Sequence, residues 1–93
     1  MVTGTLLVND NSAEVLFDSG ATHSFISNIF VKSLGCHSLE TVIDEFWVRT
    51  LMGADVKITH RIPSIEVNLT KRCLVAEVYI LGMKDFDAIL GMD

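Results

Sequence analysis

The segment VLFDSGATHSFIS, residues 15–27, decides the fold predicted for this chain. It begins as an apolar run of strand-forming residues and stops abruptly at Asp18. Ser19 and Gly20 then favour a sharp turn, because a small hydroxyl can bond nearby backbone and glycine adopts dihedral angles that other residues avoid. A carboxylate at the point where a strand leaves the core can have a perturbed pKa, and carboxylates of this kind occur preferentially at catalytic sites. We therefore predict that this loop presents Asp18 as a functional carboxylate.

Length and composition favour one small domain, residues 1–93. The apolar fraction is 49% and the mean hydropathy is +0.43, which suggests that a partner covers some apolar surface. The net charge is −5 and the seven basic residues are scattered, so no nucleic-acid partner is expected. No apolar run approaches the roughly 18 residues that a membrane span needs, and no secretory signal is visible. We expect no membrane partner and a cytoplasmic location.

The cysteines and histidines match no known ligand spacing. Cys36 and Cys73 lie far apart with no second cysteine or paired histidine near either, so we expect reduced, partly buried thiols rather than a disulfide. His23, His37 and His60 fit no metal signature. The sequence predicts no metal and no cofactor.

The N-terminal part of the chain predicts a hairpin that ends at the Asp18 loop. Residues 3–8 and 13–17 are extended-favouring runs on either side of the turn formers at residues 9–12. Further on, residues 46–61 alternate between apolar and polar side chains around a glycine-containing tip at residues 52–55. This second hairpin could lie over a cleft as a lid.

A helix is predicted over residues 25–34, where apolar residues recur at spacings of three and four. Ser24 or Ser27 could cap its start, and Gly35 is a natural C-terminal stop. Lys32 near the end suits the helix dipole. This helix is expected to fill the core.

The remaining chain predicts further strands. Pro63 marks a bend or a sheet edge, and an alternating strand follows at residues 65–69. After a turn at residues 70–72, residues 73–81 form a mostly apolar strand, and after another turn residues 86–93 form a short one. With about seven short strands and one helix, an all-β barrel or sandwich is favoured.

A serine hydrolase is the first chemical alternative, because Ser19 and His23 lie close to Asp18 in the sequence. The nucleophile elbow G-x-S-x-G is absent, and nothing in the sequence places His23 within hydrogen-bond reach of Ser19. We do not favour this chemistry.

The segments VLFDSGATHSFIS and FDAILGMD, residues 86–93, together resemble the protease region of gypsy-type long-terminal-repeat retrotransposon polyproteins, a branch of the retropepsin aspartic proteases. The similarity extends over essentially the whole chain. It implies an all-β acid-protease fold, a retropepsin-like closed barrel with a flap hairpin and one short helix after the catalytic loop. It also implies an aspartic endopeptidase that processes a retrotransposon polyprotein, and a cytoplasmic location that includes virus-like particles.

The implied reaction needs two carboxylates that share one proton. The chain has one D-S-G sequence, at residues 18–20. Asp87 and Asp93 are not second catalytic aspartates, because neither is followed by Ser or Thr and then Gly. The resemblance therefore implies a homodimer, in which each copy supplies one catalytic Asp18 and the pair cleaves an extended peptide.

The resemblance assigns roles to the rest of the catalytic loop. The counterpart of Ser19 bonds across the dimer to the partner's loop, and Gly20 lets the two loops approach. Ala21 and Thr22 would line the substrate backbone. Two further groups are implied: Met52, Gly53 and Ala54 at the flap tip, which would contact substrate, and Ile89, Leu90 and Gly91 in the strand beside the catalytic loop.

Family members continue past the I-L-G-M-D segment into a helix and a segment that, in retroviral relatives, forms much of the dimer interface. We therefore expect a domain that is truncated at its C-terminus. Two alternatives stay open: a catalytically inactive retropepsin-like binding or dimerisation module, and an unrelated small β-barrel in which D-S-G is a coincidence.

Overall fold

The computed structural model describes residues 2–34, 39–50, 53–69 and 71–91. In this part of the chain, seven strands form one sheet and one short helix follows the third strand. The predicted all-β architecture with one short helix is therefore confirmed. The strands are β1 (Val2–Val8), β2 (Asn11–Asp18), β3 (Phe25–Ser27), β4 (Glu40–Arg49), β5 (Asp55–Leu69), β6 (Arg72–Leu81) and β7 (Ala88–Gly91), and the helix is α1 (Asn28–Leu34).

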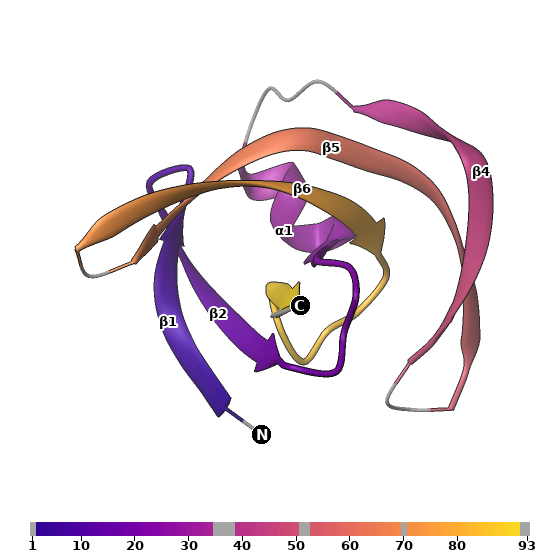
Figure 1. Ribbon diagram of the computed structural model, residues 1–93, viewed down its shortest axis with the longest axis horizontal. Coiled ribbons are helices and arrows are strands. Elements are labelled where there is room, and N and C mark those ends of the chain that lie inside the picture. The colour runs from indigo at the N-terminus through magenta and orange to yellow at the C-terminus, as the bar shows by residue number, and fades with distance from the viewer. Residues whose placement is uncertain (1, 35–38, 51–52, 70, 92–93) are drawn as a thin grey trace.

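The sheet closes on itself in the order β1-β2-β7-β3-β6-β5-β4. Leu7 and Val8 of β1 also pair with Asn68 and Val67 of β5, which joins the first six of these strands into a ring. Strand β4 pairs only with β5 and lies on the outside of it (Figure 1). The prediction of a closed barrel with a projecting hairpin is confirmed.

The first hairpin turns more tightly than predicted. Val8 pairs with Asn11, so only Asn9 and Asp10 form the loop, with φ angles of 47° and 67°. Asn and Asp tolerate this left-handed region better than other side chains, and the resulting twist matches that of the flanking strands. Ser12, predicted as part of the turn, belongs to β2.

The predicted helix start is wrong, because Phe25 and Ile26 belong to β3. Both residues pair with β6 on one side and with β7 on the other. Their spacing relative to later apolar residues fits a helix, but pairing on two edges stabilises the extended form instead. Both side chains are buried.

Ser27 caps the helix, which begins at Asn28. The Ser27 Oγ accepts hydrogen bonds from the backbone N–H groups of Ile29, at 3.1 Å, and Phe30, at 3.4 Å. Lys32 lies in the last turn, as predicted, and the predicted stop at Gly35 lies outside the described residues. No helix in the described part of the chain is long and apolar enough to cross a membrane.

Strand β5 is longer than the sequence indicates, because it continues through Pro63. The pairing of β5 with β6 shifts register between Ile62 and Ile65, so Pro63 sits at an irregularity where no ladder hydrogen bond needs its missing N–H. The predicted bend is therefore a bulge within one strand.

Three smaller predictions also need correction. Arg72, predicted in a turn, begins β6, and β7 begins at Ala88, so Phe86 and Asp87 lie in the loop before it, while residues 92 and 93 lie outside the described residues. Cys73 pairs with Asn68 and is exposed rather than partly buried. Residue 36 lies outside the described residues.

Two groups of buried side chains stabilise the ring. Burying a Val, Leu or Ile side chain contributes about 1.5–3 kcal/mol. The main core contains Val8, Ala13, Val15, Ile26, Phe30, Ile62, Ile65, Val67, Val78 and Ala88. The cleft-side core contains Phe25, Ile58 and Leu81, with Val42, Phe46, Val48, Val56, Tyr79, Met83 and Ile89 packed against it.

Candidate active site

Asp18 is the last residue of β2 and is exposed to solvent. The backbone N–H of Gly20 donates to its Oδ1 at 3.0 Å, and the N–H of Ala21 donates to its main-chain oxygen at 3.2 Å. The loop therefore turns back immediately after the strand and orients the carboxylate through its own backbone. Ser19 and Gly20 are exposed beside it.

The strand β7 lies between β2 and β3, so the loop that joins β2 to β3 must pass around its end. Gly91 pairs with Asp18, and its N–H donates to the Oγ of Ser24 at 3.1 Å. A Cβ at Gly91 would lie 2.6 Å from the oxygen of Ala21 and 2.8 Å from the oxygen of His23. Only glycine fits this approach, so Gly91 sets the path of the loop at residues 19–24, which we name the catalytic loop after its counterpart in the resemblance described above.

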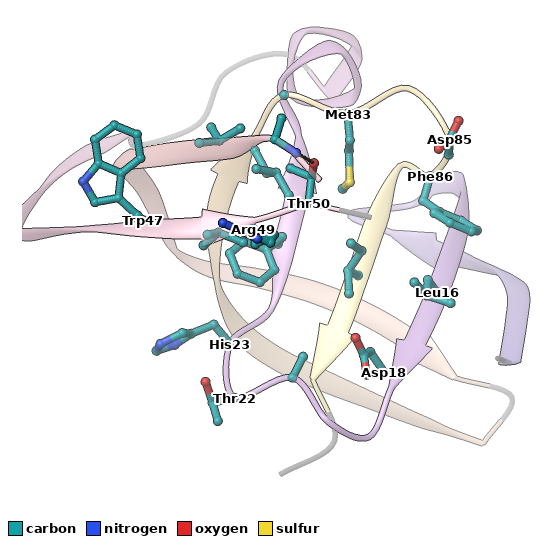
Figure 2. A pocket seen from close by; sticks show the side chains of 18 of the residues that line it. Leu16, Asp18, Thr22, His23, Trp47, Arg49, Thr50, Met83, Asp85 and Phe86 are labelled. Carbon is teal, nitrogen blue, oxygen red and sulfur yellow. Dashed lines mark hydrogen bonds between the residues drawn. The ribbon is translucent and has the colours of Figure 1, made fainter. Parts of the chain in front are cut away.

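A cleft of about 780 Å³ opens above Asp18, between this loop and the hairpin of β4 and β5 (Figure 2). Residues of the cleft-side core, together with the side chains packed against it, form most of its apolar lining. The lining residues are Leu16, Asp18, Gly20, Ala21, Thr22, His23, Phe25, Phe46, Trp47, Val48, Arg49, Thr50, Ala54, Val56, Leu81, Gly82, Met83, Lys84, Asp85, Phe86 and Ile89.

The predicted site residues divide into two groups. Gly20, Ala21, Thr22, Ala54 and Ile89 line the cleft together with Asp18. The other predicted site residues do not line the cleft or are not described. Ser19, Gly53, Leu90 and Gly91 are not lining residues, and residue 52 lies outside the described residues.

Hydrogen bonds join the described residues on the two sides of the tip of the second hairpin. The N–H of Gly53 donates to the oxygen of Thr50 at 2.9 Å, and the N–H of Thr50 donates to the oxygen of Ala54 at 2.8 Å. Gly53 has a φ of 82°, which glycine adopts without strain. Arg49 and Asp55 pair across the base of the turn at 3.0 Å. Thr50 and Ala54, one on each side of the tip, both line the cleft.

His23 is a site residue for which the sequence suggested no role in the cleft. Its ring lies 5.0 Å from the ring of Phe46 on β4 and 5.2 Å from that of Tyr79 on β6, measured between centroids. It therefore joins the catalytic loop to the hairpin strand. Apolar and polar residues alternate along β4, which turns Phe46 and Val48 inward. This pattern in the sequence was the signal that could have indicated the contact.

The segment before β7 also lines the cleft, although its composition indicated only a turn. Met83, Lys84, Asp85 and Phe86 all contribute to the lining. Figure 2 shows Met83 and Phe86 on the opposite side of the drawing from His23. The position of the β6–β7 connection therefore determines where this wall of the cleft lies.

The geometry gives no support to the serine hydrolase alternative. Ser19 does not line the cleft, and the His23 ring packs against aromatic rings. Across residues 2–34, 39–50, 53–69 and 71–91, no three His, Cys, Asp or Glu side chains are arranged to hold a metal ion.

A closed β ring, a carboxylate at the end of its second strand and a hairpin over the cleft define the acid-protease fold. The chain belongs to the retroviral aspartyl protease family, whose model matches residues 1–93. Among solved structures, the fold is similar to that of EIAV protease complexed with the inhibitor HBY-793, with a TM-score of 0.74 and 17% identity over 97% of this chain and 80% of that chain. No curated protein matches the chain by sequence.

Proposed function

We propose that this chain is one half of an aspartic endopeptidase, active as a homodimer, that processes a gypsy-type retrotransposon polyprotein. The observation that carries the proposal is Asp18, an exposed carboxylate in the cleft whose Oδ1 is held by the N–H of Gly20. Membership of the retroviral aspartyl protease family supports the same chemistry.

The reaction requires a second carboxylate beside the first. Like charges about 3 Å apart cannot both ionise, so such a pair shares one proton. The ionised member takes a proton from water, which attacks the peptide carbonyl, while the protonated member donates to the carbonyl oxygen. Because the chain contains one D-S-G, a symmetric second copy would supply the other Asp18.

The exposure of the catalytic loop is consistent with this assembly. Asp18, Ser19 and Gly20 are all exposed in the single chain, where they can meet the same residues of a second copy. In the dimer, Ser19 would bond to the partner's loop, and Gly20, which has no side chain, would permit the close approach. Leu90 packs behind the loop against the main core.

The substrate would be an extended peptide that lies between the catalytic loop and the hairpin. Ala21 and Thr22 would contact its backbone from below, and the tip at residues 52–54 would close over it. Closure would exclude water from the tetrahedral intermediate and strengthen the electrostatic interactions within the site.

The decisive experiment replaces Asp18→Asn and measures peptide cleavage. Removing one member of a catalytic unit is expected to lower kcat by about 10³-fold or more, and pepstatin is expected to inhibit the unmodified chain. Asp10→Asn is the matched control, because Asp10 lies in the β1–β2 turn at a positive φ that Asn also tolerates. Its activity should be unchanged.

Sedimentation at micromolar concentration separates the proposal from its main rival. A dimeric chain that cleaves peptide, and loses cleavage but not dimerisation with Asp18→Asn, supports the endopeptidase. A folded dimer with no cleavage supports a binding or dimerisation module. Cleavage that persists in Asp18→Asn contradicts the assigned chemistry.

A further inference from the structure

The wall of the cleft formed by residues 82–87 is irregular in structure, yet it carries four of the cleft-lining side chains, Met83, Lys84, Asp85 and Phe86. A segment without ladder hydrogen bonds of its own needs other partners to keep one position. Such bonds are made at its two ends, by Ser27 to Met83 near the start and by Asp87, the last residue of the segment, to Glu14 and Ser27.

Asp87 anchors the C-terminal end of the wall to β2 and β3. Its N–H donates to the oxygen of Glu14 at 2.9 Å, and its Oδ2 accepts from the N–H of Glu14 at 2.8 Å. Its main-chain oxygen accepts from the N–H of Ser27 at 2.8 Å. The side chain thus extends the β2–β7 pairing, which begins at Val15 and Ala88, by one more residue pair.

Ser27 anchors the N-terminal end of the wall. Its Oγ donates to the oxygen of Met83 at 3.2 Å while it accepts from the N–H groups of Ile29 and Phe30. The hydroxyl proton and both acceptor positions are therefore occupied. Ser27 is 3% exposed, so its loss would leave buried polar groups without their partner.

We propose that Ser27 and Asp87 are positioning residues that fix the wall at residues 82–87 and so set which substrate side chains the cleft accepts. The selectivity half of the proposal rests on the proposed endopeptidase function. Neither residue lines the cleft, and both act through the placement of Met83 and Phe86.

The first test compares Ser27→Ala with Ser33→Ala. Ser33 is a matched control, because it lies in α1 and its Oγ donates to the oxygen of Phe30 at 2.7 Å without any bond to the wall. The readout is the ratio of kcat/KM for two peptides that differ only in Ala or Phe beside the scissile bond. Both peptides meet the same enzyme, so a smaller folded fraction cancels in this ratio.

We expect Ser27→Ala to change the ratio by about 5-fold or more, since shifts in a pocket wall alter discrimination between apolar side chains by this order. Ser33→Ala should change it by less than about 2-fold on the same basis. Equal ratios in Ser27→Ala and the unmodified chain would overturn the selectivity role.

The second test does not need activity. Amide hydrogen exchange at residues 82–87 should accelerate in Ser27→Ala and in Asp87→Ala, and it should stay near the original rate in Asp87→Asn, whose side-chain oxygen can still accept from Glu14. Asp87→Ala decides the question if Ser27→Ala does not fold. Unchanged exchange in a folded Asp87→Ala would overturn the positioning role, whereas absent cleavage in the unmodified chain would contradict only the proposed function.

Discussion

The two sides of the cleft are stabilised by different kinds of contact. On the catalytic-loop side, the backbone of Gly91 lies so close to the oxygens of Ala21 and His23 that no side chain fits between them. On the hairpin side, the pair Arg49–Asp55 has side chains that are 73% and 51% exposed, and Trp47 is 66% exposed. The contact at Gly91 is closed by tight packing, whereas the end of the hairpin around Arg49 and Asp55 is held by contacts at the surface.

This difference has an energetic consequence. Disturbing a tightly packed contact costs about 1–3 kcal/mol, whereas an exposed ion pair contributes about 0–1 kcal/mol. The loop beside Gly91 should therefore keep its geometry, while the end of the hairpin around Arg49 and Asp55 moves at little cost. A change in the position of this end of the hairpin would then leave Asp18 in place.

The base of the hairpin is irregular as well. Thr41 pairs with His60, and the next assigned pair joins Phe46 to Ile58, so residues 42–45 of β4 lie opposite Thr59 alone. Extra residues interrupt a ladder and bend the strand that contains them. The structure therefore places a bulge where the hairpin meets the ring.

The largest effect is expected from Gly91→Ala, which tests whether the catalytic-loop side is as tightly packed as its distances indicate. The new Cβ would meet two backbone oxygens, which have little freedom to move. We expect a loss of about 1–3 kcal/mol in the free energy of unfolding, with a fall in Tm of roughly 4–8 °C for each kcal/mol. Thermal and urea unfolding measure both quantities.

Gly82→Ala is the control for this substitution, because a Cβ at Gly82 would have no atom within 4 Å. Its effect should stay within about 0.5 kcal/mol, as for surface changes in general. If Gly91→Ala and Gly82→Ala were equally stable, the backbone around Gly91 would have room for a Cβ. The contrast drawn between the two sides of the cleft would then be wrong.

A smaller effect is expected at His23, whose ring joins the two sides by packing against Phe46. The single variants His23→Ala and Phe46→Ala and the double variant form a cycle that isolates this contact. We expect a coupling free energy of about 0.5–1.5 kcal/mol, as for other aromatic pairs. Urea unfolding of the four chains measures it.

The neighbouring residue Trp47 provides the control cycle, because no ring contact joins it to His23 in the described part of the chain. Its coupling with His23 should lie within about 0.3–0.5 kcal/mol of zero. Equal coupling in the two cycles would show that the ring contact with Phe46 is not the specific connection between loop and hairpin.

Local signals in the sequence predict much of the fold. The turn formers at Asn9 and Asp10 indicate the first hairpin, and the apolar run that stops at Asp18 indicates a strand that ends in an exposed loop. These features depend on neighbours in the chain, because turn geometry and strand ends are set by a few adjacent residues.

Features that depend on distant partners could not be predicted in the same way. Phe25 and Ile26 have the spacing of a helix, and only pairing with β6 and β7 makes them a strand. The bond between Glu14 and Asp87 spans 73 positions. The side chains of the wall at residues 82–87 become part of the cleft through such contacts, and no local pattern encodes them.

The smallest effect is expected from Arg49→Gln, which removes the ion pair with Asp55 at the hairpin tip. Because both side chains are more than half exposed, the loss should be about 0.2–1 kcal/mol and should shrink at high salt. Arg72→Gln is the control, since Arg72 is exposed and has no ion pair within the described residues. Urea unfolding at low and high salt should separate the two variants only at low salt. A loss above about 2 kcal/mol, outside the range of exposed pairs, would mean that the tip is held as firmly as the catalytic loop.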